Sequence, residues 1–499
     1  MYVSTRGATE KLTAAQAIAQ GIAPDGGLFV PESLPAMDEQ ALARMIPLTY
    51  QERAVAVLQL FLPDYSENEL KNCVAGAYGG NKFSSPAVAP VVKIGEGVFA
   101  LELWHGPTSA FKDMALQLLP RLLACALKKN NEQAEIVILV ATSGDTGKAA
   151  LEGFRDVEQT RVMVFYPENG VSQIQRLQMV TQQGDNLAVF AVTGNFDDAQ
   201  TGVKHIFNDR AFNAQLGASG FKLSSANSIN WGRLVPQIVY YFSAYADLVR
   251  NKQLTLGCPV NFVVPTGNFG NILAGYYAKR MGLPINKLIC ASNSNNVLTE
   301  FLTTGVYNRN REFHKTYSPS MDILISSNLE RLLYHLSGDD PAAVSRWMTE
   351  LNSTGEYRVT DKQLTAIKDL FPAGWVSDSQ TVAAIGQVYK EYGYALDPHT
   401  AVAWQVAENY RRQSGDTTPY IIVATASPFK FNDTVLSALL GHDSQSASEF
   451  AALNKLAELI NSPVPAALAE LEHLPVRHAA ACNPKEMTAA VKAALHITE

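Results

Sequence analysis

The chain has 499 residues, of which 47% are hydrophobic and 17% charged, so it can bury more than one core and is neither disordered nor fibrous. Forty basic and forty-seven acidic side chains give a net charge of -7, which excludes the basic footprint of a nucleic-acid-binding protein. The five cysteines are scattered without a C-x-x-C pair, which argues against disulfides and a metal site and for a reducing compartment. The sequence shows no signal-peptide core and no long apolar run, so we expect a cytoplasmic protein without a membrane partner.

The first 85 residues form a unit of their own in the sequence pattern. Apolar residues recur at helical spacing over residues 14–19, 58–62 and 70–77, and one glycine-rich turn covers residues 23–31. We therefore expect an N-terminal, mostly helical domain at residues 1–85.

From about residue 88 the pattern changes to short apolar, β-branched runs, each followed by a turn and by helix-like sequence. The predicted strands cover residues 135–141, 161–167, 186–194, 259–267, 288–292 and 420–427. Continuous apolar strands that alternate with helices are typical of parallel sheets covered on both faces, which indicates the α/β class. Ligands of such sheets lie beyond the carboxyl ends of the strands, so the loops after residues 141, 264 and 424 are candidate sites.

The first candidate is Lys112, in the segment WHGPTSAFKDMALQ (residues 104–117), between a predicted strand and a predicted helix. Phe111 and Met114 flank it with apolar side chains. A lysine among apolar neighbours near a helix N-terminus is poorly solvated, so its pKa falls and it becomes suited to Schiff-base chemistry. The alternative is an ordinary surface lysine at a turn.

The second candidate is TSGDTGKAA at residues 142–150, where glycines leave space for a ligand and Thr142, Ser143 and Thr146 offer hydroxyl groups. The Gly-Lys pair is similar to that of a P-loop, but Thr142 stands where the template needs glycine, and Ala149 where it needs serine or threonine. This disfavours a nucleotide triphosphatase and favours a smaller anion, such as a carboxylate, at the start of the next helix. The alternative is a helix N-cap without a ligand.

Two further loops follow predicted strands. In PTGNFGN, Gly267 and Gly270 leave room for a phosphate group, and three neighbours add backbone N–H donors: Asn268, Phe269 and Asn271. The spacing is not G-x-G-x-x-G, so a dinucleotide site is not supported. In TASPFKF, the hydroxyl of Thr425 suits a hydrogen bond to a ring nitrogen. Each loop is also compatible with an ordinary turn that binds nothing.

Together the four loops supply a reactive lysine, an anion loop, a phosphate cradle and a partner for a ring nitrogen. This combination resembles the fold-type II pyridoxal-phosphate enzymes, the tryptophan synthase β-like group. Within that group, HGPTSAFKD, TSGDTG, SSANSINWGR (residues 224–233) and PTGNFGN are similar to motifs of the threonine synthase family, in its longer class with an N-terminal domain. GIAPDGGLFVP near the start and TASPFKF near the end extend the resemblance over nearly the whole chain.

The resemblance implies two parallel-sheet α/β domains after the N-terminal domain. The large, cofactor-binding domain would comprise residues 86–134 and 216–445, and the small domain, which carries TSGDTG, residues 135–215. A helical tail would follow at residues 446–499. The longer class also suggests a monomer rather than a dimer.

The cofactor implied by the resemblance is pyridoxal 5'-phosphate, bound covalently to Lys112, which would also be the catalytic residue that carries protons. Thr425 would face the pyridine nitrogen. The cofactor phosphate would lie in the loop formed by Gly267, Asn268, Phe269, Gly270 and Asn271.

The implied reaction converts O-phospho-L-homoserine and water to L-threonine and phosphate. Ser143, Asp145 and Thr146 would hold the substrate carboxylate. The substrate phosphate needs a separate cationic site, for which Arg233 is the candidate because a guanidinium fork matches phosphate oxygens. Polar residues of the preceding loop would assist it, namely Ser225, Asn227, Ser228 and Asn230. Lys148 could contribute, but we expect it to be a solvated helix lysine.

Four positions carry a departure from the family pattern or a structural expectation. Asp145 stands where many relatives in the wider group have asparagine, and a second carboxylate would repel that of the substrate unless a proton is shared, so its role stays open. Ser427 takes the place of a histidine in the motif T-A-H-P-x-K-F. His105 and His399 are expected to be structural, hydrogen-bonded histidines.

Two alternative functions follow from the same residues. Another fold-type II lyase, such as an amino-acid dehydratase, would share Lys112 and the phosphate cradle but would not need Arg233. A non-catalytic relative that binds a phosphorylated metabolite is the second alternative, and the intact Lys112 argues against it.

Overall fold

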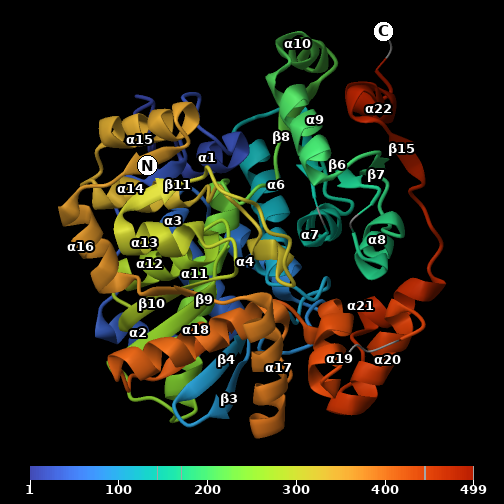
Figure 1. Cartoon of the computed structure of the whole chain (residues 1–499). Coiled ribbons are helices and arrows are strands. Elements are labelled where there is room, and N and C mark those ends of the chain that lie inside the picture. The colour runs from blue at the N-terminus through green and yellow to red at the C-terminus, as the bar shows by residue number, and fades with distance from the viewer. Residues whose placement is uncertain (143, 170, 443–445, 498–499) are drawn as a thin grey trace.

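Two large β-sheets, of six and five strands, organise the chain in the computed structural model and are surrounded by helices (Figure 1); two further sheets of the described residues have only two strands each. The structure describes residues 1–142, 144–169, 171–442 and 446–497, so the predicted site residue Ser143 lies outside the described residues. The strands and helices alternate along most of the chain, which confirms the predicted α/β class.

The N-terminal unit combines a short antiparallel sheet with helices. Its elements are β1 (Tyr2–Ser4), α1 (Ala14–Gln20), β2 (Phe29–Pro31), α2 (Glu39–Met45), α3 (Tyr50–Phe61) and α4 (Glu67–Tyr78). Three of these helices begin at capping boxes, in which the side chains of Thr13, Thr49 and Ser66 each accept a hydrogen bond from a backbone N–H of the first turn. The predicted mostly helical character of this segment is therefore confirmed, with one added strand pair.

The larger sheet has the strand order β13-β10-β9-β14-β4-β3 and is parallel except for its edge strand β3. Its strands are β3 (Val91–Gly95), β4 (Val98–Glu102), β9 (Val260–Pro265), β10 (Ile285–Ser292), β13 (Ala373–Trp375) and β14 (Tyr420–Ala424). The strands β9, β10 and β14 lie where the sequence predicted them. The antiparallel β3 was not predicted; it turns back directly into β4 without a helix between them.

Helices pack against this sheet, and α18 and α12 both contact β9 and β10. The elements of this part are α5 (Lys112–Leu116), α6 (Leu119–Lys129), α11 (Trp231–Arg250), α12 (Gly270–Arg280), α13 (Val297–Thr304), β11 (Val306–Asn308), α14 (Leu329–Leu336), α15 (Pro341–Ser353), β12 (Glu356–Arg358), α16 (Asp361–Leu370), α17 (Asp378–Tyr392) and α18 (Pro398–Ser414). The long helix α11 is buried over most of its length and packs on α3 of the N-terminal unit, where Arg53 and Asp247 form a buried ion pair at 2.7 Å.

The smaller sheet is parallel throughout, in the order β15-β7-β6-β5-β8. Its strands and helices are β5 (Glu135–Ala141), α7 (Asp145–Phe154), β6 (Thr160–Pro167), α8 (Gln173–Val180), β7 (Leu187–Val192), α9 (Phe196–Asn208), α10 (Arg210–Ala218), β8 (Phe221–Ser224) and β15 (Ala480–Cys482). The strand β5 has the predicted bounds. Its carboxyl end leads into α7, whose first residue is Asp145.

The helices of the C-terminal segment are α19 (Asn432–Leu440), α20 (Glu449–Ile460), α21 (Ala466–Ala469) and α22 (Met487–Ala494). The segment first packs against α17 through α19, and its last part, with β15 and α22, runs along the outer side of the smaller sheet (Figure 1). The expected helical tail also contains β15, which extends the sheet beside β7 and is too short to give a strand signal in the sequence. The carboxylate of Glu449 accepts hydrogen bonds from the backbone N–H groups of Gln173 and Ile174 (2.7 and 3.0 Å), so the tail caps α8.

Across the described residues, no helix is both long and apolar enough to cross a bilayer.

Candidate active site

Lys112 is the first residue of α5, and the turn before it is fastened to the loop after β14. The backbone N–H of Phe111 donates to the carbonyl oxygen of Thr425 (2.7 Å), and that of Ser427 donates to the carbonyl oxygen of Ser109 (3.0 Å). Two predicted site loops, more than 300 residues apart in the chain, therefore meet beyond the carboxyl ends of the neighbouring strands β4 and β14.

The side chain of Lys112 is 11% exposed, and its Nζ contacts two oxygen atoms. It lies 3.0 Å from Ser320 Oγ and 3.5 Å from Asp145 Oδ2. Burial lowers the pKa of Lys112; the carboxylate of Asp145 opposes this, and the charges of Lys430 and Arg233 add to the lowering. The predicted poorly solvated amine is thus present, but in a setting of charged groups rather than an apolar one.

Asp145 is the member of TSGDTG that contacts Lys112, and Thr146 beside it is half-buried. Asp145 Oδ1 lies 2.6 Å from Lys430 Nζ and accepts a hydrogen bond from Gln175 Nε2 (3.2 Å). Although burial alone raises the pKa of Asp145, the two neighbouring ammonium groups outweigh it and hold the pKa well below its ordinary value. The carboxylate is therefore ionised.

The PTGNFGN loop connects β9 to α12 and approaches the same place. A Cβ atom on Gly267 would lie 2.8 Å from the carbonyl oxygen of Ser320, the residue that contacts Lys112. Phe269 has a positive φ of 62° and starts α12 without a side-chain cap, which leaves the first backbone N–H groups of the helix for a ligand. Asn271 Nδ2 is buried and has no hydrogen-bond partner among the described residues, while its Oδ1 accepts from Tyr240 and Tyr241. The free N–H donors at the start of α12 and the orphaned amide of Asn271 fit a phosphate group.

The two remaining residues of this loop have different environments. Asn268 is exposed, and its carbonyl oxygen accepts from the backbone N–H of Asn328 (3.1 Å). Gly270 is buried and has Asn328 Nδ2 nearest to the position of an added Cβ, at 3.4 Å. Asn328 Nδ2 also donates to Ser228 Oγ (3.2 Å), so it joins the PTGNFGN loop to the SSANSINWGR segment.

Arg233 is a buried guanidinium, 5% exposed, in the first turn of α11. Its Nη1 donates to the carbonyl oxygen of Ala226 (2.6 Å), whereas its Nε has no hydrogen-bond partner in the described part of the chain. Burial lowers its pKa to about 10. Of the predicted helpers, Ser225 accepts through Oγ from the backbone N–H of Asn227 (3.1 Å), and Asn227 is exposed.

The sequence patterns missed Ser320 and the pairing of Lys430 with Asp145. Ser320 lies in a polar loop that follows no predicted strand, so nothing in the sequence marked it. Lys430 belongs to TASPFKF, but only the fold brings it to α7. Lys148 was expected to be solvated and is not: its side chain is 12% exposed and contacts Glu152 (3.7 Å) and Gln182, because the start of α7 is covered by α8.

The two histidines near the motifs are hydrogen-bonded within the protein. His105 contacts Ser84 Oγ and Glu102 Oε2, both at 2.8 Å. His399 Nδ1 contacts Asp397 Oδ1 (2.8 Å), and its Nε2 accepts from the backbone N–H of Ser320 (3.2 Å). His399 thus supports the loop that carries Ser320.

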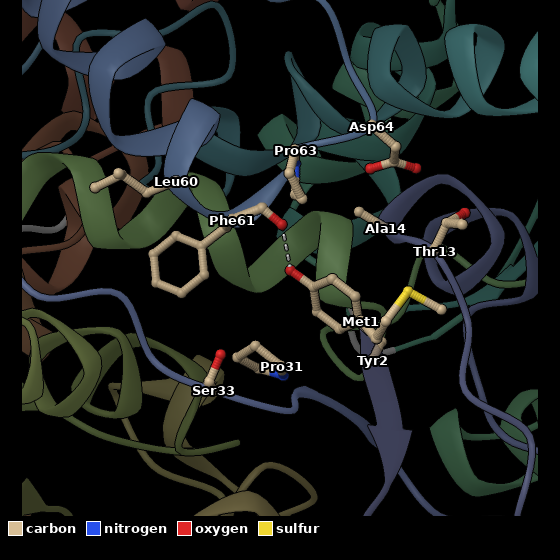
Figure 2. Close-up of a pocket in the computed structure, with 10 residues that line it drawn as sticks. All are labelled: Met1, Tyr2, Thr13, Ala14, Pro31, Ser33, Leu60, Phe61, Pro63 and Asp64. Atoms are coloured by element: carbon tan, nitrogen blue, oxygen red, sulfur yellow. Dashed lines mark hydrogen bonds between the residues drawn. The ribbon is translucent and has the colours of Figure 1, made fainter.

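A separate hollow of about 190 Å³ lies in the N-terminal unit (Figure 2). Tyr2, Pro31, Phe61 and Asp64 are among its lining residues, and the Tyr2 hydroxyl donates to the carbonyl oxygen of Phe61 (2.7 Å). It shares no lining residue with the site at Lys112. Over the described residues, no group of three or more His, Cys, Asp or Glu side chains could hold a metal ion.

Comparison with known proteins identifies the family. The description "Threonine synthase N terminus" matches residues 1–78, "Pyridoxal-phosphate dependent enzyme" matches residues 83–426, and "Threonine synthase, C-terminal" matches residues 400–494. Threonine synthase of Pseudomonas aeruginosa is 42% identical over 444 residues, which cover 88% of this chain and 90% of the relative. The chain belongs to the threonine synthase family of pyridoxal-phosphate-dependent enzymes.

Solved structures of the threonine synthase family have the same fold. The crystal structure of PLP-bound threonine synthase from Brucella melitensis superposes with a TM-score of 0.88 at 39% identity, covering 100% of this chain and 99% of that one. Human threonine synthase-like 1 is 44% identical over 434 residues, 85% of this chain, but the chain spans only 58% of that longer relative.

Proposed function

We propose that this protein is a threonine synthase, a carbon–oxygen lyase that converts O-phospho-L-homoserine and water to L-threonine and phosphate in the last step of threonine biosynthesis. The observation that carries the proposal is Arg233. Its guanidinium is buried, and among the described residues its Nε has no hydrogen-bond partner and no carboxylate forms an ion pair with it. A buried cation without an anion is unfavourable, so the position suits an anionic ligand group.

The residues around Lys112 fit pyridoxal 5'-phosphate. Lys112 offers the buried amine, Gly267 lets its loop lie against the backbone of Ser320 beside that amine, and the start of α12 offers N–H donors for the phosphate. Thr425, at the end of β14, is our candidate for the pyridine nitrogen. When bound, this cofactor withdraws electrons from the α carbon of an amino acid and so acidifies its α proton.

The chain's own residues would then act in three ways. Lys112 would accept and return protons, because burial favours its neutral form and Ser320 Oγ fixes the position of its Nζ. Thr146 and the start of α7, whose N-cap residue Gly144 has no side chain, would bind the substrate carboxylate, with Ser143 from the same loop. Arg233, with Ser225 and Asn227, would bind the substrate phosphate and so orient the carbon–oxygen bond that breaks.

The main alternative, an amino-acid dehydratase, needs the amine and the cradle but has no phosphate-bearing substrate. The test is to incubate the purified, cofactor-loaded protein separately with O-phospho-L-homoserine, L-serine and L-threonine. We expect equal amounts of threonine and phosphate from the first and no 2-oxo acid from the other two. Turnover of serine or threonine without turnover of the phosphorylated substrate would refute the assignment.

A matched pair of variants separates the phosphate site from the rest of the chemistry. Arg233→Met should raise KM for O-phospho-L-homoserine by about 100-fold, since a charge-assisted bidentate contact contributes about 1.5–3 kcal/mol and its loss also affects orientation. Arg210→Met, at the exposed start of α10, is the control and should leave KM unchanged. Equal KM values in all three proteins would contradict the role of Arg233.

We also propose a cytoplasmic monomer that has no nucleic-acid or membrane partner and the domain division given above: residues 1–85, 86–134 with 216–445, 135–215, and 446–499. The acidic balance of the chain and its five free cysteines support the location, and the two separate sheets support the division. Light scattering after gel filtration should give a mass near 54.2 kDa, and a mass twice as large would contradict the monomer.

A further inference from the structure

Asp145 lies between two lysines that come from different parts of the chain. Its Oδ1 is 2.6 Å from Lys430 Nζ, and its Oδ2 is 3.5 Å from Lys112 Nζ. Lys430 is fully buried, with 0% of its side chain exposed, and its other contact is the carbonyl oxygen of Thr108 at 3.0 Å. The closer cation of this carboxylate is therefore Lys430, not the lysine assigned to the cofactor.

This arrangement bears on whether Lys112 can act as an amine. A lone carboxylate at 3.5 Å would hold a lysine in its protonated form, the opposite of what cofactor binding and proton transfer need. The ammonium group of Lys430 is a second cation beside the same carboxylate. It neutralises the charge of Asp145, and its own charge disfavours a proton on Lys112. Since Lys430 is buried and has neutral and anionic oxygens as its contacts, its own position is fixed.

The other charged groups around Lys112 do not replace this effect. Arg233 faces it from α11 and also lowers its pKa. His399, from α18, lies behind Ser320 and is paired with Asp397. Asp145 is therefore the anion that acts on Lys112, and Lys430 is the cation bound to that anion.

We propose that Lys430 is a positioning residue whose ammonium is the permanent counter-ion of Asp145, so that Asp145 orients the Lys112 amine without holding its proton. This assigns the role that the sequence left open for the carboxylate of TSGDTG. Because the Asp145–Lys430 ion pair has no net charge, it also removes the repulsion that an unpaired carboxylate would exert on an anionic substrate. The proposal rests on the cofactor chemistry of the family and not on the identity of the substrate.

The test measures the pH at which Lys112 becomes reactive in the full-length, cofactor-free chain. Competitive labelling with acetic anhydride, followed by mass spectrometry of the peptide that contains Lys112, gives this midpoint. Lys430→Met should move the midpoint up by about one to three pH units, because the carboxylate then pairs with Lys112 alone. The Asp145→Asn, Lys430→Met double variant should return it to near the wild-type value, since both charges are gone.

One control variant and one second measurement make the result specific. Lys148→Met also removes a buried ammonium from the start of α7, but Lys148 pairs with Glu152 rather than Asp145, so the midpoint of Lys112 should not change. In the cofactor-loaded enzyme, the pH titration of the visible absorbance should move in the same direction in Lys430→Met as the labelling midpoint does.

An unchanged midpoint in Lys430→Met, or a double variant that behaves like the single one, would overturn the proposal. If the Lys430→Met variant does not fold, the labelling midpoint of Lys112 is compared between the Asp145→Asn variant and the Asp145→Asn, Lys430→Met double variant. We then expect a midpoint below wild type in the single variant and near wild type in the double variant, and equal midpoints would overturn the proposal. No substrate is present, so failure of the assigned reaction would leave these outcomes unaffected.

Discussion

The substitution Gly267→Ala tests how closely the cofactor loop packs against the loop that holds Ser320. The new Cβ would lie 2.8 Å from the carbonyl oxygen of Ser320 and 3.3 Å from Cα of Met321. Both are backbone atoms, so rotation of a side chain cannot relieve the contact. An ordinary contact begins at 3.4 Å, so the two loops must separate by about 0.6 Å.

The size of the effect follows from this displacement. Overpacking in a close-packed region costs about 1–3 kcal/mol, which corresponds to about a 5- to 150-fold change in an equilibrium constant. This separation would disturb two contacts of Ser320: the one between its Oγ and Lys112 Nζ (3.0 Å) and the one between its backbone nitrogen and His399 Nε2 (3.2 Å). We therefore expect pyridoxal 5'-phosphate to bind about 5- to 150-fold more weakly to the variant.

The assay is a titration of the cofactor-free chain with pyridoxal 5'-phosphate, followed by visible absorbance, with thermal melting in parallel. Gly217→Ala is the matched control: Gly217 lies in α10, and apart from its chain neighbours and the backbone of its own helix no described atom lies within 4 Å of the position of its added Cβ. The control should keep the cofactor affinity and gain roughly 0.5–1 kcal/mol of stability from the better helix former. Wild-type affinity and melting temperature in Gly267→Ala would refute the described packing.

Two further predictions concern buried charges outside the immediate contact with the cofactor. Arg53→Met should lower the free energy of unfolding by about 3 kcal/mol in urea, because it leaves Asp247 without its buried partner. Arg250 pairs with the same carboxylate from the exposed side, so Arg250→Met should cost less than about 1 kcal/mol. Equal losses in the two variants would contradict the burial argument. Burial raises the pKa of Asp113 to about 7. Its carboxyl group therefore stays protonated in the folded chain at pH values where the unfolded chain, with an ordinary pKa of 3.8, has lost the proton. The free energy of unfolding consequently falls as the pH rises from about 4 to about 7. Asp113→Asn should remove this loss, at most roughly 4 kcal/mol, so its melting temperature should rise relative to that of wild type as the pH increases from about 4 to about 7. Parallel pH profiles of the two proteins would count against this prediction.

Local patterns predicted the elements whose signal is contained in one segment. The apolar run of β5 and the loops after β5, β9 and β14 are such cases, since strand ends and glycine-rich turns are encoded where they occur. The edge strand β15 was not predicted, because three residues give no period and because its pairing partner β7 lies about 290 residues earlier.

The candidate site divides in the same way. Lys112 and the cradle at Gly267 and Gly270 stand in motifs, so residue type and spacing were enough to find them. Ser320 and the contact between Lys430 and Asp145 arise only when distant loops meet at the edge of the sheet. No local pattern contains that information, because it depends on the packing of α7 against the rest of the fold.

The most direct test of the central claim is to reduce the cofactor-loaded protein with borohydride and to map the labelled peptide. We expect one pyridoxyl group per chain, on Lys112. A pyridoxyl group on Lys430, which contacts Asp145, or on Lys148 of α7, or no label at all, would contradict this expectation.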